Sequence, residues 1–416
     1  MNIFGIIILC TLFFEFTIDI IANLLNLRTL GSQLPAEFVG VYDTEAYAKS
    51  QSYLRTRTTF GFVVSAFNLA VILVFWFAGG FNYIDELVRG LGWNSIFRGL
   101  VYVGVLVLMR SILSIPFSLY STFVIEEKFG FNKTTPLTFV TDLLKGMMLA
   151  VLIGGPLLIG ILTFFEYAGS YAWLYCWLVA AVFMLFIQFI APTWIMPLFN
   201  KFTPLAEGEL RNSILSYAGS VKFSLRDVFV MDGSKRSSKS NAFFTGFGKN
   251  KRIALFDTLI EKHTVAELVA VLAHEIGHYK KKHIIKGMIA GLLQMGVMFF
   301  LLSLFINNRE LFDTFFMRSV SVYASLLFFG MLYSPIEFVL SLVMNVVSRK
   351  HEFEADRFAA ETIERSEAMV DALKKLSRDN LSHLTPHPFY VSMNYSHPPV
   401  LQRIRRIRSL AGAPAR

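Results

Sequence analysis

Residues 264–282, Thr-Val-Ala-Glu-Leu-Val-Ala-Val-Leu-Ala-His-Glu-Ile-Gly-His-Tyr-Lys-Lys-Lys, contain the motif around which the chain is organised. The opening T-x-x-E, Thr264 and Glu267, is a capping box that predicts the start of a helix. In a helix, His274 and His278 lie on one face with Glu275 beside them. Two converging imidazoles suit Zn²⁺, and the adjacent carboxylate suits a general base. Two ordinary surface histidines give the same pattern by chance, so a third ligand is needed.

The composition indicates a membrane protein. Of the 416 residues, 54% are hydrophobic and 17% are charged, which is too apolar for a soluble chain. Only two cysteines occur, both in apolar runs, so the metal ligands must be His and carboxylate. Seven apolar runs are close in length to the ~20 residues that a spanning helix needs. They lie at about 3–25, 60–78, 100–124, 146–165, 171–195, 287–306 and 320–346.

Lys and Arg are sorted between alternate loops. The loops at 26–59, 125–145 and 196–286 and the tail after 346 carry nearly all of them, and the opposite loops carry four. The positive side of a membrane protein faces the cytoplasm, so we expect the N-terminus outside and the tail inside. This orientation, with attraction to anionic lipids, accounts for the net charge of +9, and no nucleic-acid partner is expected.

Polar side chains also recur inside the predicted spans. Ionisable groups at membrane depth usually face a bundle interior or a water-filled cavity, although pairing between helices gives the same pattern. Together they favour a polar interior. They are Glu15, Asp19, Asn68, Arg110, Gln188, Gln294, Glu337 and Asn345.

The predicted organisation has four parts. An N-terminal membrane domain with five spans (1–197) precedes the first part of a metallopeptidase domain (198–286). Spans six and seven (287–346) then separate it from the second part (347–416), and apolar patterning implies that both parts pack together. Two strand-like runs at 241–245 and 252–256 flank a Gly-rich turn and predict a small β-hairpin. Its edge could receive a peptide by strand addition, or the hairpin is purely structural.

The third ligand is expected in the helix-like run 348–360. Glu352 and Asp356 share a face there, whereas Glu354 points elsewhere. Glu352 can complete a His₂Glu site, and Asp356 can accept a hydrogen bond from a ligating imidazole. The alternative is a solvated acidic face that balances neighbouring Arg349, Lys350 and Arg357.

Other polar residues follow or flank these motifs. His397 and Arg403 could stabilise a developing oxyanion near the zinc, although the residues alone give only a weak signal. Four further histidines are not expected to bind metal, because they lie in a Pro-bounded loop or off the ligand face; His283 instead belongs to a basic collar at the membrane surface. These four are His263, His283, His383 and His387.

The chain closely resembles the type I CAAX prenyl endopeptidases, integral-membrane zinc metallopeptidases that cut prenylated C-termini. The resemblance spans nearly the whole chain. The E-F-x-A-D and Y-S-H-P-P elements that follow H-E-x-x-H are more specific than the zinc motif alone. The matching segments are 123–133, 192–202, 232–236, 240–242, 246–253, 274–278, 352–356 and 395–399.

The resemblance implies an all-α membrane protein with seven helices around a water-filled chamber and a zincin-like domain at its cytoplasmic end. Substrates would be peptides or prenylated proteins, and no oligomer is required. It also implies residue roles. One Zn²⁺ per chain would be held by His274, His278 and Glu352, with Glu275 as base and acid, Asp356 behind a ligand, His397 and Arg403 as transition-state stabilisers, and Asn241 and Ala242 in the substrate-binding strand.

Some positions depart from the family. Glu354 stands where Gln is more common, and Lys239 and Phe243 stand where His and Tyr are common, so the substrate preference stays open. The last six residues carry no endoplasmic-reticulum retrieval signal, which favours a bacterial inner membrane over the endoplasmic reticulum membrane. Besides CAAX processing, two functions remain: a broad-specificity quality-control protease, and a non-catalytic transporter or scaffold with a relic metal site.

Overall fold

The computed structural model describes residues 1–31, 33–225, 227–245 and 252–411. Within these residues, seven helical segments are long and apolar enough to cross a membrane, as expected from the sequence. They are α1 (Ile3–Arg28), α2 (Thr44–Phe77), the segment of α4 (Ser95–Glu126), the segment of α5 and α6 (Pro136–Tyr167), the segment of α7 (Gly169–Leu198), α11 (His283–Phe305) and α13 (Val322–Thr362).

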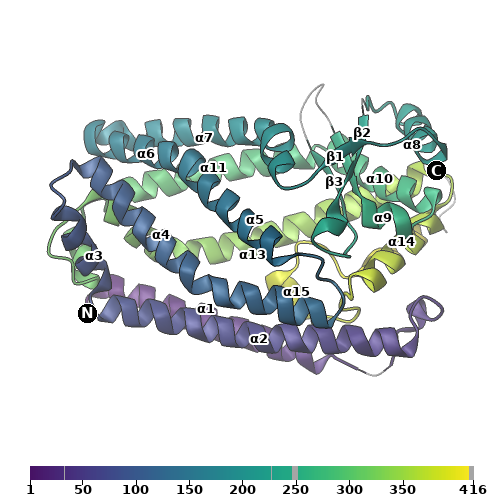
Figure 1. Cartoon of the computed structure of the whole chain (residues 1–416), viewed down its shortest axis with the longest axis horizontal. Helices are drawn as coiled ribbons and strands as arrows, with labels where there is room; N and C mark the ends of the chain where they lie inside the picture. Colours follow the sequence, from purple (N-terminus) through teal and green to yellow (C-terminus); the bar gives the residue numbers. More distant parts are fainter. Residues whose placement is uncertain (32, 226, 246–251, 412–416) are drawn as a thin grey trace.

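The spanning helices run along the long axis of the molecule, and the small sheet lies at one end with the C-terminus (Figure 1). Side chains along the spans are sparsely buried: only 6% to 17% of the apolar window of each span is inaccessible. Such low burial fits helices that surround an interior space, as the resemblance implies, rather than a solid bundle.

The seventh span is longer than its apolar run predicts. Helix α13 has 41 residues, or about 60 Å at 1.5 Å per residue, about twice the hydrocarbon thickness of a bilayer. It therefore leaves the apolar layer and continues as one helix through Glu352 and Asp356 to Thr362. A single continuous helix, with Pro335 inside it, thus carries the predicted third ligand from the apolar layer into the domain that holds the zinc motif.

The predicted hairpin is confirmed and forms part of a larger sheet. Strands β3 (Ala242–Thr245) and β4 (Arg252–Phe256) pair antiparallel, with Ala242 opposite Leu255. Two strands that sequence patterning missed, β1 (Phe202–Pro204) and β2 (Asp227–Met231), extend the sheet in the order β1-β2-β4-β3. Because β3 is the last strand, one of its edges makes no pairing among the described strands. The turn at 246–251 lies outside the described residues.

A hydrophobic core joins the sheet to the zinc-motif helix, α10 (Val265–Lys280). Leu268, Leu272 and Ile276 of α10 pack with Ile253 of β4 and with Ala359 of α13. The two segments that spans six and seven separate in the sequence therefore share one core. The remaining helices of this region are α8 (Glu209–Ser220), α9 (Asp257–Lys262), α14 (Ser366–Asp379), α15 (Pro388–Asn394) and α16 (Val400–Ala411).

The loop after α1 and the start of α2 also belong to this region. Phe38, Tyr42 and Tyr47, which the sequence analysis grouped with the membrane domain, pack in a second core with Leu373 of α14 and Ile404 of α16. The loop thereby anchors the start of α2 to the helices that surround the zinc motif. At the opposite end, the short helices α3 (Gly80–Arg89) and α12 (Arg309–Thr314) connect the spans.

Candidate metal centre

Helix α10 begins at the predicted capping box. Thr264 Oγ1 accepts a hydrogen bond from Glu267 N at 3.4 Å, and Glu267 Oε2 accepts one from Thr264 N at 3.0 Å. Glu267 is also ion-paired with Lys375 of α14 at 2.7 Å. The cap satisfies amides that the first turn of a helix leaves without partners. It thereby fixes where α10 starts and which residues face the core.

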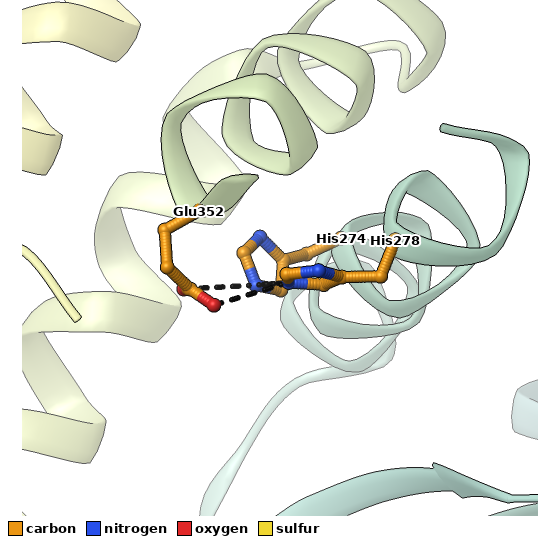
Figure 2. Close-up of side chains that lie close together, drawn as sticks. All are labelled: His274, His278 and Glu352. Atoms are coloured by element: carbon orange, nitrogen blue, oxygen red, sulfur yellow. Dashed lines mark hydrogen bonds and ion pairs between the residues drawn. The ribbon is translucent and has the colours of Figure 1, made fainter. Parts of the chain in front are cut away.

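The two histidines of the motif point at a carboxylate from α13 (Figure 2). His274 Nε2 lies 3.1 Å from His278 Nε2 and 3.4 Å from Glu352 Oε2, and His278 Nε2 lies 3.2 Å from Glu352 Oε1. One donor atom from each residue lies within 4.8 Å of the others, close enough for a single cation to contact all three. The structure therefore brings together the three ligands expected from the sequence.

The close approach of α10 and α13 depends on a glycine within the motif. A Cβ built at Gly277 would lie 3.1 Å from both the Cα and the carbonyl oxygen of Ala355, and 3.3 Å from Phe358 Cβ. A side chain here would meet backbone atoms, which cannot rotate away. Gly277 thus lets the helix of His274 and His278 contact the helix of Glu352, a role that the sequence analysis did not assign.

Asp356 contacts the ring nitrogen of His274 that faces away from Glu352 and His278. Its Oδ1 lies 2.9 Å from Nδ1 of His274, so a neutral His274 donates this Nδ1 proton and presents Nε2 to the cation. Arg403 Nε and Nη2 bind Asp356 Oδ2 and Oδ1 at 2.8 and 2.6 Å. Its Nη1 also lies 3.6 Å from Glu352 Oε2. In this structure Arg403 therefore contacts the two carboxylates, in addition to lining the cleft.

The donor set fits Zn²⁺. Glu352 Oε2 is buried, and its contacts with His274 Nε2 at 3.4 Å and Arg403 Nη1 at 3.6 Å are both longer than a good hydrogen bond. An ionised oxygen in that state is costly unless a cation lies beside it. Burial alone would lower the pKa of His274, but hydrogen bonds to Asp356 and Glu352 outweigh it and raise the pKa to about 9. The site thus attracts a positive charge, and two imidazoles with one carboxylate are ligands that Zn²⁺ prefers.

Support for His278 comes from residues that the sequence analysis had set aside. His283 Nδ1 lies 3.0 Å from His278 Nδ1, and His283 Nε2 lies 3.0 Å from Glu354 Oε2. His283 was expected to miss the ligand face because helical spacing was continued past His278. Helix α10 ends at Lys280, and Lys282 has a positive φ of 58°. The chain therefore turns and brings His283 back against His278.

The metal centre opens into a cleft of about 480 Å³. Glu275 and His397 line it beside the ligands, and His397 Nε2 lies 3.3 Å from Glu352 Oε1 with its side chain 64% exposed. Asn241 and Ala242, from the edge of the sheet, line the same cleft. All nine residues proposed for the site from the sequence are therefore at or directly behind this cleft.

The three other histidines that were discounted as ligands have contacts of their own. His263 Nδ1 lies 3.1 Å from the carbonyl oxygen of Leu259. His383 Nε2 lies 3.0 Å from Thr29 Oγ1, and burial lowers its pKa to about 4. His387 Nδ1 accepts a hydrogen bond from Phe389 N and caps α15. None of them is in the His/carboxylate group that could hold an ion among the described residues.

Comparison of this chain with known proteins shows the family to which it belongs. Residues 23–201 match the family described as CAAX prenyl protease N-terminal, five membrane helices, and residues 204–411 match peptidase family M48. The chain belongs to the CAAX prenyl protease 1 family. It is similar to CAAX prenyl protease 1 of Saccharomyces cerevisiae, with 36% identity over 90% of this chain and 88% of the relative. Homologues from Oryza sativa subsp. japonica (38% identity, 89% of both chains) and Homo sapiens (34%, covering 91% of this chain and 89% of the relative) agree.

The fold of the family is equally clear. The crystal structure of S. mikatae Ste24p superposes with a TM-score of 0.92 at 34% identity, covering 98% of this chain and 99% of that one. As a member of this family, the chain is a multi-pass membrane protein and a zinc metallopeptidase. The hypothesis of a non-catalytic transporter or scaffold gains no support. The relatives named here are eukaryotic, so they give no support to the expected bacterial inner membrane.

Proposed function

We propose that this chain is a zinc-dependent endopeptidase that cleaves near the C-terminus of prenylated, CAAX-type proteins or peptides. One observation supports the proposal: a single cleft is lined by His274 and Glu352 and by Ala242 of β3, a strand with one edge unpaired among the described residues. A peptide added to this edge would run extended past His274 and Glu275. The relatives, which are named as CAAX prenyl proteases, supply the substrate class.

The strand register supports peptide binding at β3. Asn241 O accepts a hydrogen bond from Phe256 N at 3.1 Å, so Asn241 faces β4. Main-chain groups alternate along an antiparallel strand, so the N–H and C=O of Ala242 point away from β4. Ala242 N donates to Asn241 Oδ1 at 2.9 Å, and a peptide could take over this donor. Strand addition of this kind fixes the position of a substrate through main-chain bonds.

A bound Zn²⁺ would supply a Lewis acid that polarises the scissile carbonyl and lowers the pKa of a water. His274, His278 and Glu352 would hold it. Glu275, next to His274 and open to the cleft, would take the proton of the attacking water and transfer it to the departing amine.

His397 lines the cleft beside Glu352 and would donate a hydrogen bond to the developing oxyanion. Arg403 would add positive charge through its neighbouring Nη1. Its bidentate contact with Asp356 supports a second role, which is to hold the carboxylates in place.

The cleft is suited to aliphatic substrate side chains. Next to the polar catalytic groups, its wall includes Val271 of α10 and three apolar residues of α14, Met369, Ala372 and Leu373. Apolar side chains at a binding site favour apolar substrate side chains over charged ones. This lining supports cleavage beside the aliphatic residues of a CAAX sequence, and the sorting of Lys and Arg supports a cytoplasmic location of the cleft.

The prenyl requirement is tested with one peptide in two forms. The purified full-length protein should cleave a farnesylated CAAX peptide with a higher kcat/KM than the same peptide without the farnesyl group. Equal values for both peptides would contradict the CAAX assignment and would favour the broad-specificity quality-control protease.

A further inference from the structure

The two ligand imidazoles, His274 and His278, have different hydrogen-bond partners at Nδ1, and only the partner of His274 was expected from the sequence. His274 is held at Nδ1 by Asp356, at 2.9 Å. The corresponding atom of His278, its Nδ1, lies 3.0 Å from Nδ1 of His283. His283 has in turn a carboxylate partner, Glu354 Oε2, at 3.0 Å. A chain of three side chains thus leads away from the metal centre.

Proton positions along this chain are consistent with zinc binding. A neutral His278 that offers Nε2 to the cation carries its proton on Nδ1 and donates it to Nδ1 of His283. His283 then carries its own proton on Nε2 and donates it to the Glu354 carboxylate. Each hydrogen bond has one donor and one acceptor, and each ring is neutral. The carboxylate end of the chain therefore selects the tautomer of His278 that can bind metal.

The geometry of His283 is fixed by its surroundings. Its side chain is 4% exposed, and its ring stacks on His351 with the centroids 4.0 Å apart and the planes at 10°. Lys282, at φ 58°, provides the turn that returns His283 to His278. Glu354 and His351 lie on α13, the helix that also carries the ligand Glu352, and His283 is the first residue of α11.

We propose that His283 and Glu354 are positioning residues for the zinc ligand His278, with Glu354 orienting His283 and His283 fixing His278 with Nε2 toward the metal. The proposal rests on the zinc site described above but concerns metal binding, not cleavage. It gives the second ligand the support that Asp356 gives the first. Such partners behind a metal ligand usually contribute about 10–100-fold to metal affinity.

The test is the zinc dissociation constant of the full-length protein, measured by competition with a chelator. His283→Leu and Glu354→Leu should each weaken zinc binding by about 10–100-fold. Glu354→Gln keeps an oxygen that accepts from His283 Nε2, so it should bind zinc within about threefold of the original protein. Glu361→Leu, at an exposed position of the same helix, is the matched control and should not change the constant.

Two results would overturn the proposal. One is unchanged zinc affinity in Glu354→Leu. The other is an equal loss in Glu354→Gln and Glu354→Leu, which would show that the accepting oxygen is irrelevant. Because both variants are at one partly exposed position, this pair decides the question even if His283→Leu fails to fold. The measurement needs no substrate, so a wrong substrate class leaves it unaffected.

Discussion

Gly277 lies against the backbone of Ala355, where a Cβ would be only 3.1 Å from both Cα and the carbonyl oxygen. This contact sets the distance between α10, which carries His274 and His278, and α13, which carries Glu352. The metal centre is thus a product of helix packing as well as of ligand identity.

Enlarging residue 277 should therefore damage metal binding first. In Gly277→Ala the gain in helix propensity, about 1 kcal/mol, offsets part of an overpacking cost of about 1–3 kcal/mol. We expect a small change in melting temperature but a measurable loss of zinc affinity, and a larger loss in Gly277→Val. Chelator competition and thermal unfolding of the same samples check this. Undiminished zinc affinity in Gly277→Val would disprove the packing role.

Removing Asp356 should destabilise the fold because it takes the bidentate partner from Arg403, whose side chain is only 11% exposed. Breaking a buried ion pair from one side usually costs about 3–5 kcal/mol. The double variant Asp356→Ala with Arg403→Met leaves neither charge alone and should be more stable than Asp356→Ala. Thermal unfolding in detergent compares the two. The expectation fails if the double variant is the less stable.

Zinc binding should release a proton at neutral pH. The pKa of His274 is raised to about 9, since its hydrogen bonds to Asp356 and Glu352 outweigh burial, so zinc must displace a proton below that pH. Zinc affinity should therefore rise with pH by about tenfold per unit until the pH approaches the pKa. Calorimetry in buffers of different ionisation enthalpy counts the protons: about one at pH 7, and fewer in Asp356→Asn. A count of zero in the unmodified protein would rule this out.

Removing the main-chain N–H of Ala242, which points away from β4, should impair substrate binding and leave the metal centre intact. Ala242→Pro removes the N–H that points away from β4, and one hydrogen bond of about 0.5–1.5 kcal/mol corresponds to a decrease in kcat/KM of up to about tenfold. Ala242→Gly keeps the amide and is the control. Full activity of Ala242→Pro would exclude strand addition at this residue.

Much of the site follows from local sequence because helical periodicity fixes faces. The capping box at Thr264, the i,i+4 pair of histidines and the i,i+4 pair Glu352 and Asp356 predict two helix faces, and these meet in the structure. Likewise, seven apolar runs predict seven spans. Charge sorting predicts their orientation, although nothing in the fold alone tests it.

Other features depend on contacts between distant segments. His283 was misplaced because periodicity does not continue through a turn, here at Lys282 with its positive φ. Strand β1 has three residues, too few for a period-2 pattern, and it forms by pairing with β2. The space requirement at Gly277 is visible only when α13 lies beside α10. Phe38 and Tyr42, in the loop between the first two spans, gave no sign that they would complete the core around α14.

The central claim is that Glu275 moves the proton in a zinc-dependent cleavage. The most direct measurement compares the unmodified protein with Glu275→Gln for zinc content and for cleavage of a farnesylated CAAX peptide. We predict one zinc per chain in both proteins and a loss of kcat of about 10²–10⁴-fold or more in the variant. Cleavage by zinc-loaded Glu275→Gln at the rate of the unmodified protein would contradict the account.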